Sequence, residues 1–293
     1  MEISKFETKL DVIKNYFKQT KKSIFTFTEI ANILEDKRLE WNLPNTMTAF
    51  KFLELLLKHT DLKKTSIKFP SREYSLFSWG DVSAWAYCLS FIKNLYYTHR
   101  TALYIHKLIN DPPDKIYVNF EQRRSSASNY SSSLSQERID FAFSRTQRVT
   151  TNIANFKEYK VYLLNGQNTN MCGVIEAYFN QNKVLVTNLE RTLIDVVVRP
   201  SYTNGILEIL NCYKLAKERI SIENLIRTLK KLAFVYPYHQ AIGFLLEKSR
   251  VYDQNEISKL KNLGLKYDFY LEREMSEKKY SKEWKLYYPK FLD

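Results

Sequence analysis

The sequence predicts an α+β protein made of two domains. At about 150 residues per domain, its 293 residues favour two domains. Hydrophobic residues make up 44% and aromatic residues 15% of the chain, which is the composition of a globular protein. Near residue 65 the apolar pattern changes from a helical period to the alternation of a strand. We expect an N-terminal domain over residues 1–80 and a larger mixed α/β C-terminal domain over 81–293.

Three amphipathic helices are predicted in the first domain. The first carries the apolar stripe Phe6, Leu10, Ile13 and Phe17. The segment Thr26–Glu29 reads as a capping box that begins the second helix, with Phe25 and Ile30 as a hydrophobic staple. The third runs from about Thr46 to His59, and its expected inner face is Met47, Phe50, Leu53 and Leu57.

A two-stranded ribbon follows these helices, with strands over 65–69 and 74–79 and a turn at Pro70–Glu73. Helices followed by such a ribbon are the order of a winged helix-turn-helix, in which the third helix enters the DNA major groove. The predicted DNA-binding residues lie at the start of that helix and on the ribbon. They are Asn45, Thr46, Thr48, Lys51, Lys63, Lys64, Lys68 and Arg72. Amides and hydroxyls can reach base edges, while lysine and arginine can contact phosphates.

The second domain is expected to mix helices and strands. We expect a helix from near Asp81 with Trp85, Leu89 and Ile92 aligned, a helix capped by Thr98, and a strand over 115–120. A serine-rich loop is predicted at about 122–136. Short strands are predicted near 139–144, 159–164, 172–179 and 183–187, with a late one at 266–271. The segment Thr187–Glu190 reads as a capping box, and further helices fit 205–217, 222–233 and 238–249.

Composition excludes several classes of protein. The six glycines are too scattered for a dinucleotide-binding loop or a Walker loop. No cofactor is predicted. Three widely spaced cysteines suggest neither a disulfide framework nor a metal site. No signal peptide or membrane span is recognised, so the sequence predicts a cytoplasmic protein without membrane contact. The net charge of +13 is compatible with a nucleic-acid partner.

No catalytic constellation stands out. His99 and His106 share a helix face but lack acidic neighbours at ligand spacing, so no metal site is predicted. Glu190 and Asp195 lie about 140° apart around one helix, so they do not form a carboxylate pair, and Asp195 could instead pair with Arg191 or Arg199. The segment around Tyr236–Phe244 could be a packing corner or a binding surface. The sequence therefore predicts a protein that is not an enzyme.

Three segments carry a resemblance to a known family. They are Tyr97–Leu108, Val186–Asp195 with Arg199-Pro200, and Tyr236–Phe244. Together they resemble the AbiEi family of abortive-infection antitoxins, from bacterial type IV toxin-antitoxin systems for phage defence. Polar and charged residues of these segments form the expected functional surface of the C-terminal domain. They are His99, Arg100, His106, Glu190, Arg191, Asp195, Tyr238 and His239.

The resemblance implies a nucleoid-associated transcriptional repressor that binds double-stranded DNA at its own promoter. It also implies an antitoxin that counters a nucleotidyltransferase-type toxin, without requiring stable contact with it. Two alternatives remain open. One is a metal-dependent nuclease, or another nucleic-acid-modifying enzyme, with its site near Glu190, Asp195 and His239. The other is a protein-interaction module that does not use its winged helix on DNA.

Overall fold

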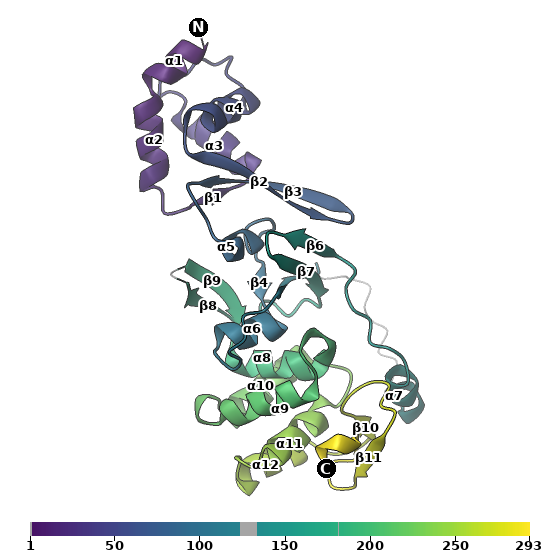
Figure 1. The fold of residues 1–293 in the computed structure, drawn as a ribbon. Coiled ribbons are helices and arrows are strands. Elements are labelled where there is room, and N and C mark those ends of the chain that lie inside the picture. The colour runs from purple at the N-terminus through teal and green to yellow at the C-terminus, as the bar shows by residue number, and fades with distance from the viewer. Residues whose placement is uncertain (1, 124–133, 181) are drawn as a thin grey trace. The chain divides into compact units, whose positions relative to one another are not determined.

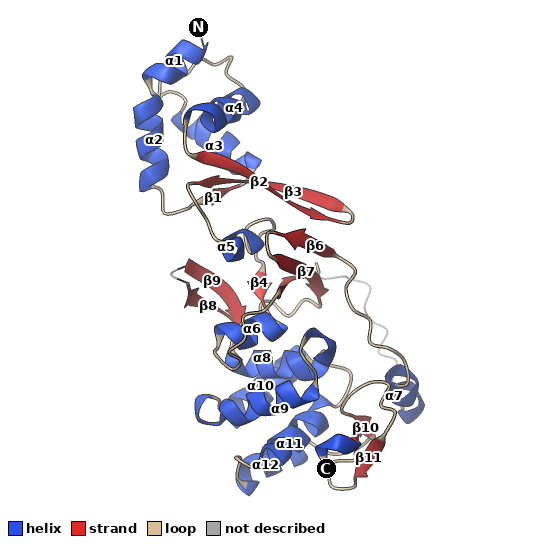
Figure 2. Ribbon diagram, in the orientation of Figure 1, coloured by secondary structure: helices blue, strands red, loops and turns tan. Residues whose placement is uncertain are grey.

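The computed structural model describes residues 2–123, 134–180 and 182–293, which adopt a mixed α/β fold (Figures 1 and 2). The chain divides into two compact units. The first comprises Met1–Leu95 with Asn152–Val161, and the second comprises Tyr96–Thr151 with Tyr162–Asp293. The sequence places the domain boundary after residue 80. Most of the predicted serine-rich loop lies outside the described residues.

The helices that begin the first unit are α1 (Glu2–Thr8), α2 (Leu10–Gln19), α3 (Phe27–Lys37) and α4 (Ala49–His59). The single helix predicted at the start is two helices, because Lys9 leaves the helical conformation with φ −109° and ψ 5°. The capping box of α3 is confirmed: Thr26 Oγ1 accepts from Glu29 N, and Glu29 Oε2 accepts from Thr26 N. Phe25 and Ile30 join the same buried core.

Helix α4 differs from the prediction in both its start and its inner face. It begins at Ala49 after the N-cap Thr48, whose hydroxyl accepts from Lys51 N. Its buried residues are Phe52, Leu53, Leu55 and Leu56. Phe50, predicted to face inward, is 73% exposed. The inner face is turned relative to the predicted stripe because consecutive leucines offered more than one helical register.

The sheet of the first unit has the order β1-β3-β2 and is antiparallel. Its strands are β1 (Ile24–Phe25), β2 (Leu62–Phe69) and β3 (Arg72–Trp79). The hairpin turn is Pro70-Ser71, shorter than predicted, because Arg72 pairs with Phe69 at the start of β3. Leu62 and Phe77 face the helical core, while Ile67 and Leu76 are buried on the opposite face.

The helix predicted from near Asp81 is the short α5 (Ala84–Cys88), capped by Ser83. Leu89 is its C-cap, so Trp85, Leu89 and Ile92 do not form a continuous stripe. Phe91 packs instead against the hairpin, with its ring centroid 5.3 Å from that of Phe69. The strand β6 (Ile153–Phe156) also belongs to this unit.

The larger sheet in the second unit runs in the order β7-β5-β4-β9-β8. Its strands are β4 (Tyr96–Tyr97), β5 (Lys115–Glu121), β7 (Tyr159–Gly166, whose last five residues belong to this unit), β8 (Val174–Phe179) and β9 (Asn182–Thr187). The pair β4–β9 is parallel, and β4–β5 and β8–β9 are antiparallel. The strands predicted at 115–120, 159–164, 172–179 and 183–187 are thus confirmed as elements.

The strand predicted at 139–144 is wrong, because this segment is the helix α7 (Gln136–Phe143). Ser135 caps the helix through its hydroxyl, which accepts from Arg138 N at 3.4 Å. Ile139 and Phe143, four residues apart, are its buried residues. A helical spacing of two apolar side chains therefore outweighs the β propensity of the segment.

Helices form most of the rest of the second unit. They are α6 (His99–Ile105), α8 (Leu189–Val198), α9 (Ile206–Leu215), α10 (Ile222–Leu232), α11 (Tyr238–Ser249) and α12 (Gln254–Lys261). A small sheet of order β10-β12-β11 follows, with strands β10 (Phe269–Tyr270), β11 (Lys278–Ser281) and β12 (Leu286–Pro289). Buried residues of these elements form one core cluster together with Trp284, which lies in the turn between β11 and β12. The capping box predicted at Thr187 is wrong: Asn188 is the N-cap of α8, and its side chain accepts from Arg191 N.

Among the described residues, no helix combines the length and the apolar character that crossing a membrane requires.

Candidate nucleic-acid interface and an arginine-lined pocket

The start of α4 presents the first group of predicted DNA-binding residues. Asn45 and Thr46 lie in a turn before the helix, and both are exposed. Thr48 is exposed too, but its hydroxyl accepts from Lys51 N at 3.2 Å as the helix cap. The Lys51 ammonium pairs with Glu54 at 3.0 Å. Such a solvent-exposed pair contributes little stability, so it can exchange for another anion.

Phe50 adds an exposed aromatic ring to this end of α4. The ring stacks on Phe27 of α3, with a centroid separation of 4.5 Å. Sequence analysis missed it because the predicted helical register placed Phe50 inside. An exposed apolar side chain beside polar ones can contact the methyl group of thymine in a major groove.

The basic residues of the hairpin lie on two different faces. Because paired residues of a sheet share a face, Lys64 and Lys68 lie on the same face as Phe77, which packs on the helices. Lys63 and Arg72 lie on the opposite face. Lys63 pairs with Asp81 at 2.6 Å, and the Arg72 guanidinium lies 4.8 Å from the ring centroid of Tyr74. Only Lys64 and Lys68 therefore share the helix side of the hairpin.

A buried ion pair forms the centre of the second unit's site. Arg191 Nε donates to Asp195 Oδ1 at 2.7 Å, four residues along α8, as one of the two pairings the sequence predicted. Thr98 Oγ1 donates to Asp195 Oδ2 at 3.2 Å, and Arg191 Nη1 donates to Cys172 O at 2.8 Å. Burial raises the pKa of Asp195, while the adjacent Arg191 guanidinium opposes the rise. Both carboxylate oxygens of Asp195 thus accept a hydrogen bond, so Asp195 is not a free carboxylate.

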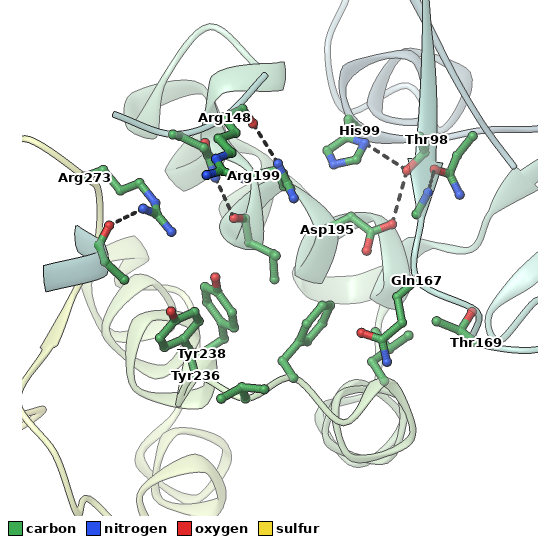
Figure 3. A pocket seen from close by; sticks show the side chains of 18 of the residues that line it. Thr98, His99, Arg148, Gln167, Thr169, Asp195, Arg199, Tyr236, Tyr238 and Arg273 are labelled. Carbon is green, nitrogen blue, oxygen red and sulfur yellow. Dashed lines mark hydrogen bonds between the residues drawn. The ribbon is translucent and has the colours of Figure 1, made fainter. Parts of the chain in front are cut away.

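This ion pair lies at the wall of a pocket of about 680 Å³, drawn in Figure 3. Four of the predicted surface residues line it, namely His99, Arg191, Asp195 and Tyr238. Four further arginines line it that are not among the predicted surface residues. They are Arg145, Arg148, Arg199 and Arg273. None of these four has a carboxylate within ion-pair distance in the described part of the chain.

Three of these four arginines contact backbone carbonyls or rings through their guanidinium groups. Arg199 Nη1 donates to Arg148 O at 2.8 Å, and Arg273 Nη1 donates to Ala142 O. The Arg145 guanidinium lies 3.9 Å from the ring centroid of Phe141. The loop after α7 supplies Arg145 and Arg148, and Arg199 follows α8 directly. Their separation along the sequence explains why no motif reveals the cluster.

Two titratable groups of the pocket are kept uncharged. Burial, together with Arg199 and Arg191, lowers the pKa of His99 to about 3. Burial raises the pKa of Tyr238 to about 12, although Arg273 and Arg199 act in the other direction. Both groups therefore remain neutral near pH 7. The positive charge of the pocket comes from guanidinium groups.

The other four predicted surface residues do not line this pocket. Arg100 Nε pairs with Glu208 at 3.1 Å, and the His106 ring lies 2.6 Å from Thr187 O. The Glu190 carboxylate accepts from Ser221 N at 3.4 Å. His239 Nε2 lies 2.7 Å from Gly264 O, and this residue lines a separate cavity of about 330 Å³. Glu190, Asp195 and His239 are thus not brought together in the pocket.

Within the described residues, no group of three or more His, Cys, Asp and Glu side chains could hold a metal ion.

Comparison with protein-family models and with curated proteins gave no match. A solved structure, the crystal structure of the RV2827C protein from Mycobacterium tuberculosis, is similar to this chain with a TM-score of 0.57. The two are 10% identical in sequence, and the similarity covers 96% of this chain and 91% of that one. At this identity the similarity concerns the fold alone, and it agrees with a mixed α/β architecture over nearly the whole chain.

Proposed function

We propose that the chain is a DNA-binding transcriptional repressor of its own operon and the antitoxin of a type IV toxin-antitoxin system. The observation that carries the DNA-binding half is the first unit's arrangement of α3, α4 and the β2–β3 hairpin. The start of α4 is exposed, and two exposed lysines, Lys64 and Lys68, lie on the helix side of the hairpin. This order of elements fits a winged helix-turn-helix. Such a repressor would act at the nucleoid in the cytoplasm.

In this arrangement the two parts of the interface have different tasks. Asn45, Thr46 and Phe50 would contact base edges in the major groove, which gives sequence discrimination. Lys64 and Lys68 would contact phosphates, which gives affinity for any duplex. Lys51 would exchange its surface pairing with Glu54 for a phosphate or a guanine.

The antitoxin half of the proposal rests on the resemblance of three segments to the AbiEi family. Its partner would be a nucleotidyltransferase-type toxin, and stable contact with that toxin is not required. The test is to express the gene adjacent to this one alone and together with this chain. Rescue of growth supports an antitoxin, and an adjacent gene that is harmless with and without this chain contradicts it.

The DNA-binding half is tested by fluorescence anisotropy. The protein is titrated against the duplex upstream of its own gene and against a scrambled duplex, at two salt concentrations. Tight binding to the upstream duplex alone, with a steep salt dependence, is expected of a repressor. Equal and salt-sensitive binding to both duplexes would contradict a repressor, because nonspecific attraction by the net charge of +13 would then explain the binding.

A pair of matched double variants locates the phosphate contacts. Lys64→Ala with Lys68→Ala should weaken binding to both duplexes and reduce the salt slope by about 1.8, since each phosphate contact contributes about 0.9. Lys63→Ala with Arg72→Ala removes the same charge from the opposite face and should leave the slope nearly unchanged. Equal effects of the two double variants would refute the assignment of the phosphate contacts to the helix side of the hairpin.

Discrimination is tested with Phe50→Ala, because Phe50 is exposed and does not cap the helix. It should reduce the preference for the upstream duplex while keeping the salt slope. Thr48→Ala is a poorer probe, because losing the cap would also cost about 1 kcal/mol of stability.

A further inference from the structure

The arginine-lined pocket of the second unit combines two features that ordinary surface clefts lack. Five arginines and one aspartate line it in the described part of the chain, and that aspartate is already paired with Arg191. The lining also includes the aromatic rings of Tyr96, Phe141, Phe234, Tyr236 and Tyr238. Positive charge and aromatic surface therefore share one cavity.

The guanidinium groups suit a ligand with several negative charges. Arginine carries five N–H donors. Arg199 Nη1 donates to Arg148 O, and Arg273 Nη1 donates to Ala142 O and, at 3.5 Å, to Arg145 O. The remaining donors can contact phosphate oxygens in the two-pronged geometry that guanidinium favours. Arg199, Arg273 and Tyr238 all line this pocket.

The aromatic side of the pocket suits a planar ring. Phe141 is 58% exposed, and the Tyr236 and Tyr238 side chains lie together on the wall drawn in Figure 3. Neither tyrosine hydroxyl has a hydrogen-bond partner in the described part of the chain. A base could stack on a ring, and a hydroxyl could bond to its edge or to a sugar. The volume of about 680 Å³ lies within the range of small-molecule sites.

We propose that this pocket binds a free nucleoside triphosphate, with Arg148 and Arg199 on the phosphates and the Phe141 and Tyr236 rings toward the base. The proposal does not depend on DNA binding by the first unit. A free nucleotide is favoured over a nucleic-acid strand because a cavity of this size can enclose one nucleotide, whereas a strand needs an extended groove.

The experiment is isothermal titration of the full chain with ATP, GTP, CTP and UTP separately. Adenosine and inorganic tripolyphosphate serve as probes that lack one half of the ligand. At least one nucleotide should bind with a stoichiometry of one, adenosine should not bind, and tripolyphosphate should bind more weakly than the nucleotide. Equal affinity for tripolyphosphate would overturn the proposal, because the rings would then contribute nothing.

Arginine variants connect the binding to the pocket. Arg148→Gln with Arg199→Gln should weaken nucleotide binding about tenfold or more, because two charge-assisted contacts are lost. Both residues are exposed, so the fold should survive. The matched control is Arg227→Gln with Arg250→Gln, which removes two exposed charges outside the pocket and should not change binding. Similar losses in both variants would overturn the proposal.

A nucleic-acid ligand is tested by competition. A short single-stranded oligonucleotide, with its terminal nucleotide matched to the best triphosphate, is added to the preformed nucleotide complex. Failure to displace the nucleotide at equal concentration supports a free-nucleotide site. Displacement of the nucleotide at equal concentration would overturn the proposal in favour of a strand-binding groove.

Discussion

The buried histidine of the arginine-lined pocket should make the second unit lose stability in mild acid. Burial and two nearby arginines lower the pKa of His99 from 6.5 to about 3. As the pH falls below 6.5, the unfolded chain binds a proton at this histidine while the folded chain does not. The unfolded state is therefore favoured as the pH decreases, and the stability contributed by neutral His99 is lost between about pH 6.5 and pH 3.

The size of the effect follows from the two pKa values. One pKa unit corresponds to about 1.4 kcal/mol, so lowering the pH from 7 to 5 should cost about 2 kcal/mol through His99 alone. The variant His99→Asn removes this titration. Asparagine suits the site because residue 99 has a φ of 50°, a left-handed conformation that Asn adopts more readily than most residues.

The assay is native-state hydrogen exchange of the amides in α6 and α8, which reports the opening of this unit rather than of the whole chain. At pH 7 the variant should be the less stable, since it loses ring contacts such as that with Tyr202. At pH 5 the difference should shrink by about 2 kcal/mol. His99→Gln, with a different shape, should show the same pH response. A difference that is the same at both pH values would refute the reasoning.

Three further predictions concern stability and are checked by urea unfolding. Asp195→Ala should cost about 3–5 kcal/mol, because it leaves the Arg191 charge buried without its partner; a cost below that of an ordinary surface change would contradict it. Gly243→Ala should cost about 3 kcal/mol or more, because the new Cβ would lie 2.1 Å from the Trp284 ring. Thr26→Ala should cost about 1 kcal/mol through the lost cap of α3, and replacement by Ser should restore most of it.

Local signals predicted the elements whose ends and faces are fixed by neighbouring residues. The capping box at Thr26, the hairpin strands and the helix over 238–249 all appear in the structure. The pairing of Arg191 with Asp195 was also foreseeable, because residues four apart are neighbours on a helix. The capping box from Asp253 to Glu256, which begins α12, is a further local signal of this kind.

Other features depend on partners that are distant along the chain. Strands β1, β4 and β10 have two residues each and exist only through their neighbours in a sheet. The segment of helix α7 is predicted as a strand because its aromatic residues favour strands, whereas the burial of Ile139 and Phe143 on one side of the segment favours the helix. The exposure of Phe50 depended on where α4 begins, which a run of leucines left open. Boundaries and outward-facing residues were therefore the weakest predictions.

The pocket illustrates why composition alone could not reveal the second site. Asp195 neutralises Arg191, so the uncompensated charge belongs to arginines whose positions only the fold brings together. Lysine would serve poorly there, because an ammonium lacks the planar surface with which a guanidinium such as that of Arg145 can stack on a ring such as Phe141. Nor would it offer a planar, two-pronged fork to a phosphate after bonding a carbonyl, as Arg199 can after bonding Arg148 O. Guanidinium groups can thus contact rings and carbonyls and still keep donors for an anion, so Arg199→Lys should weaken nucleotide binding although it preserves the charge.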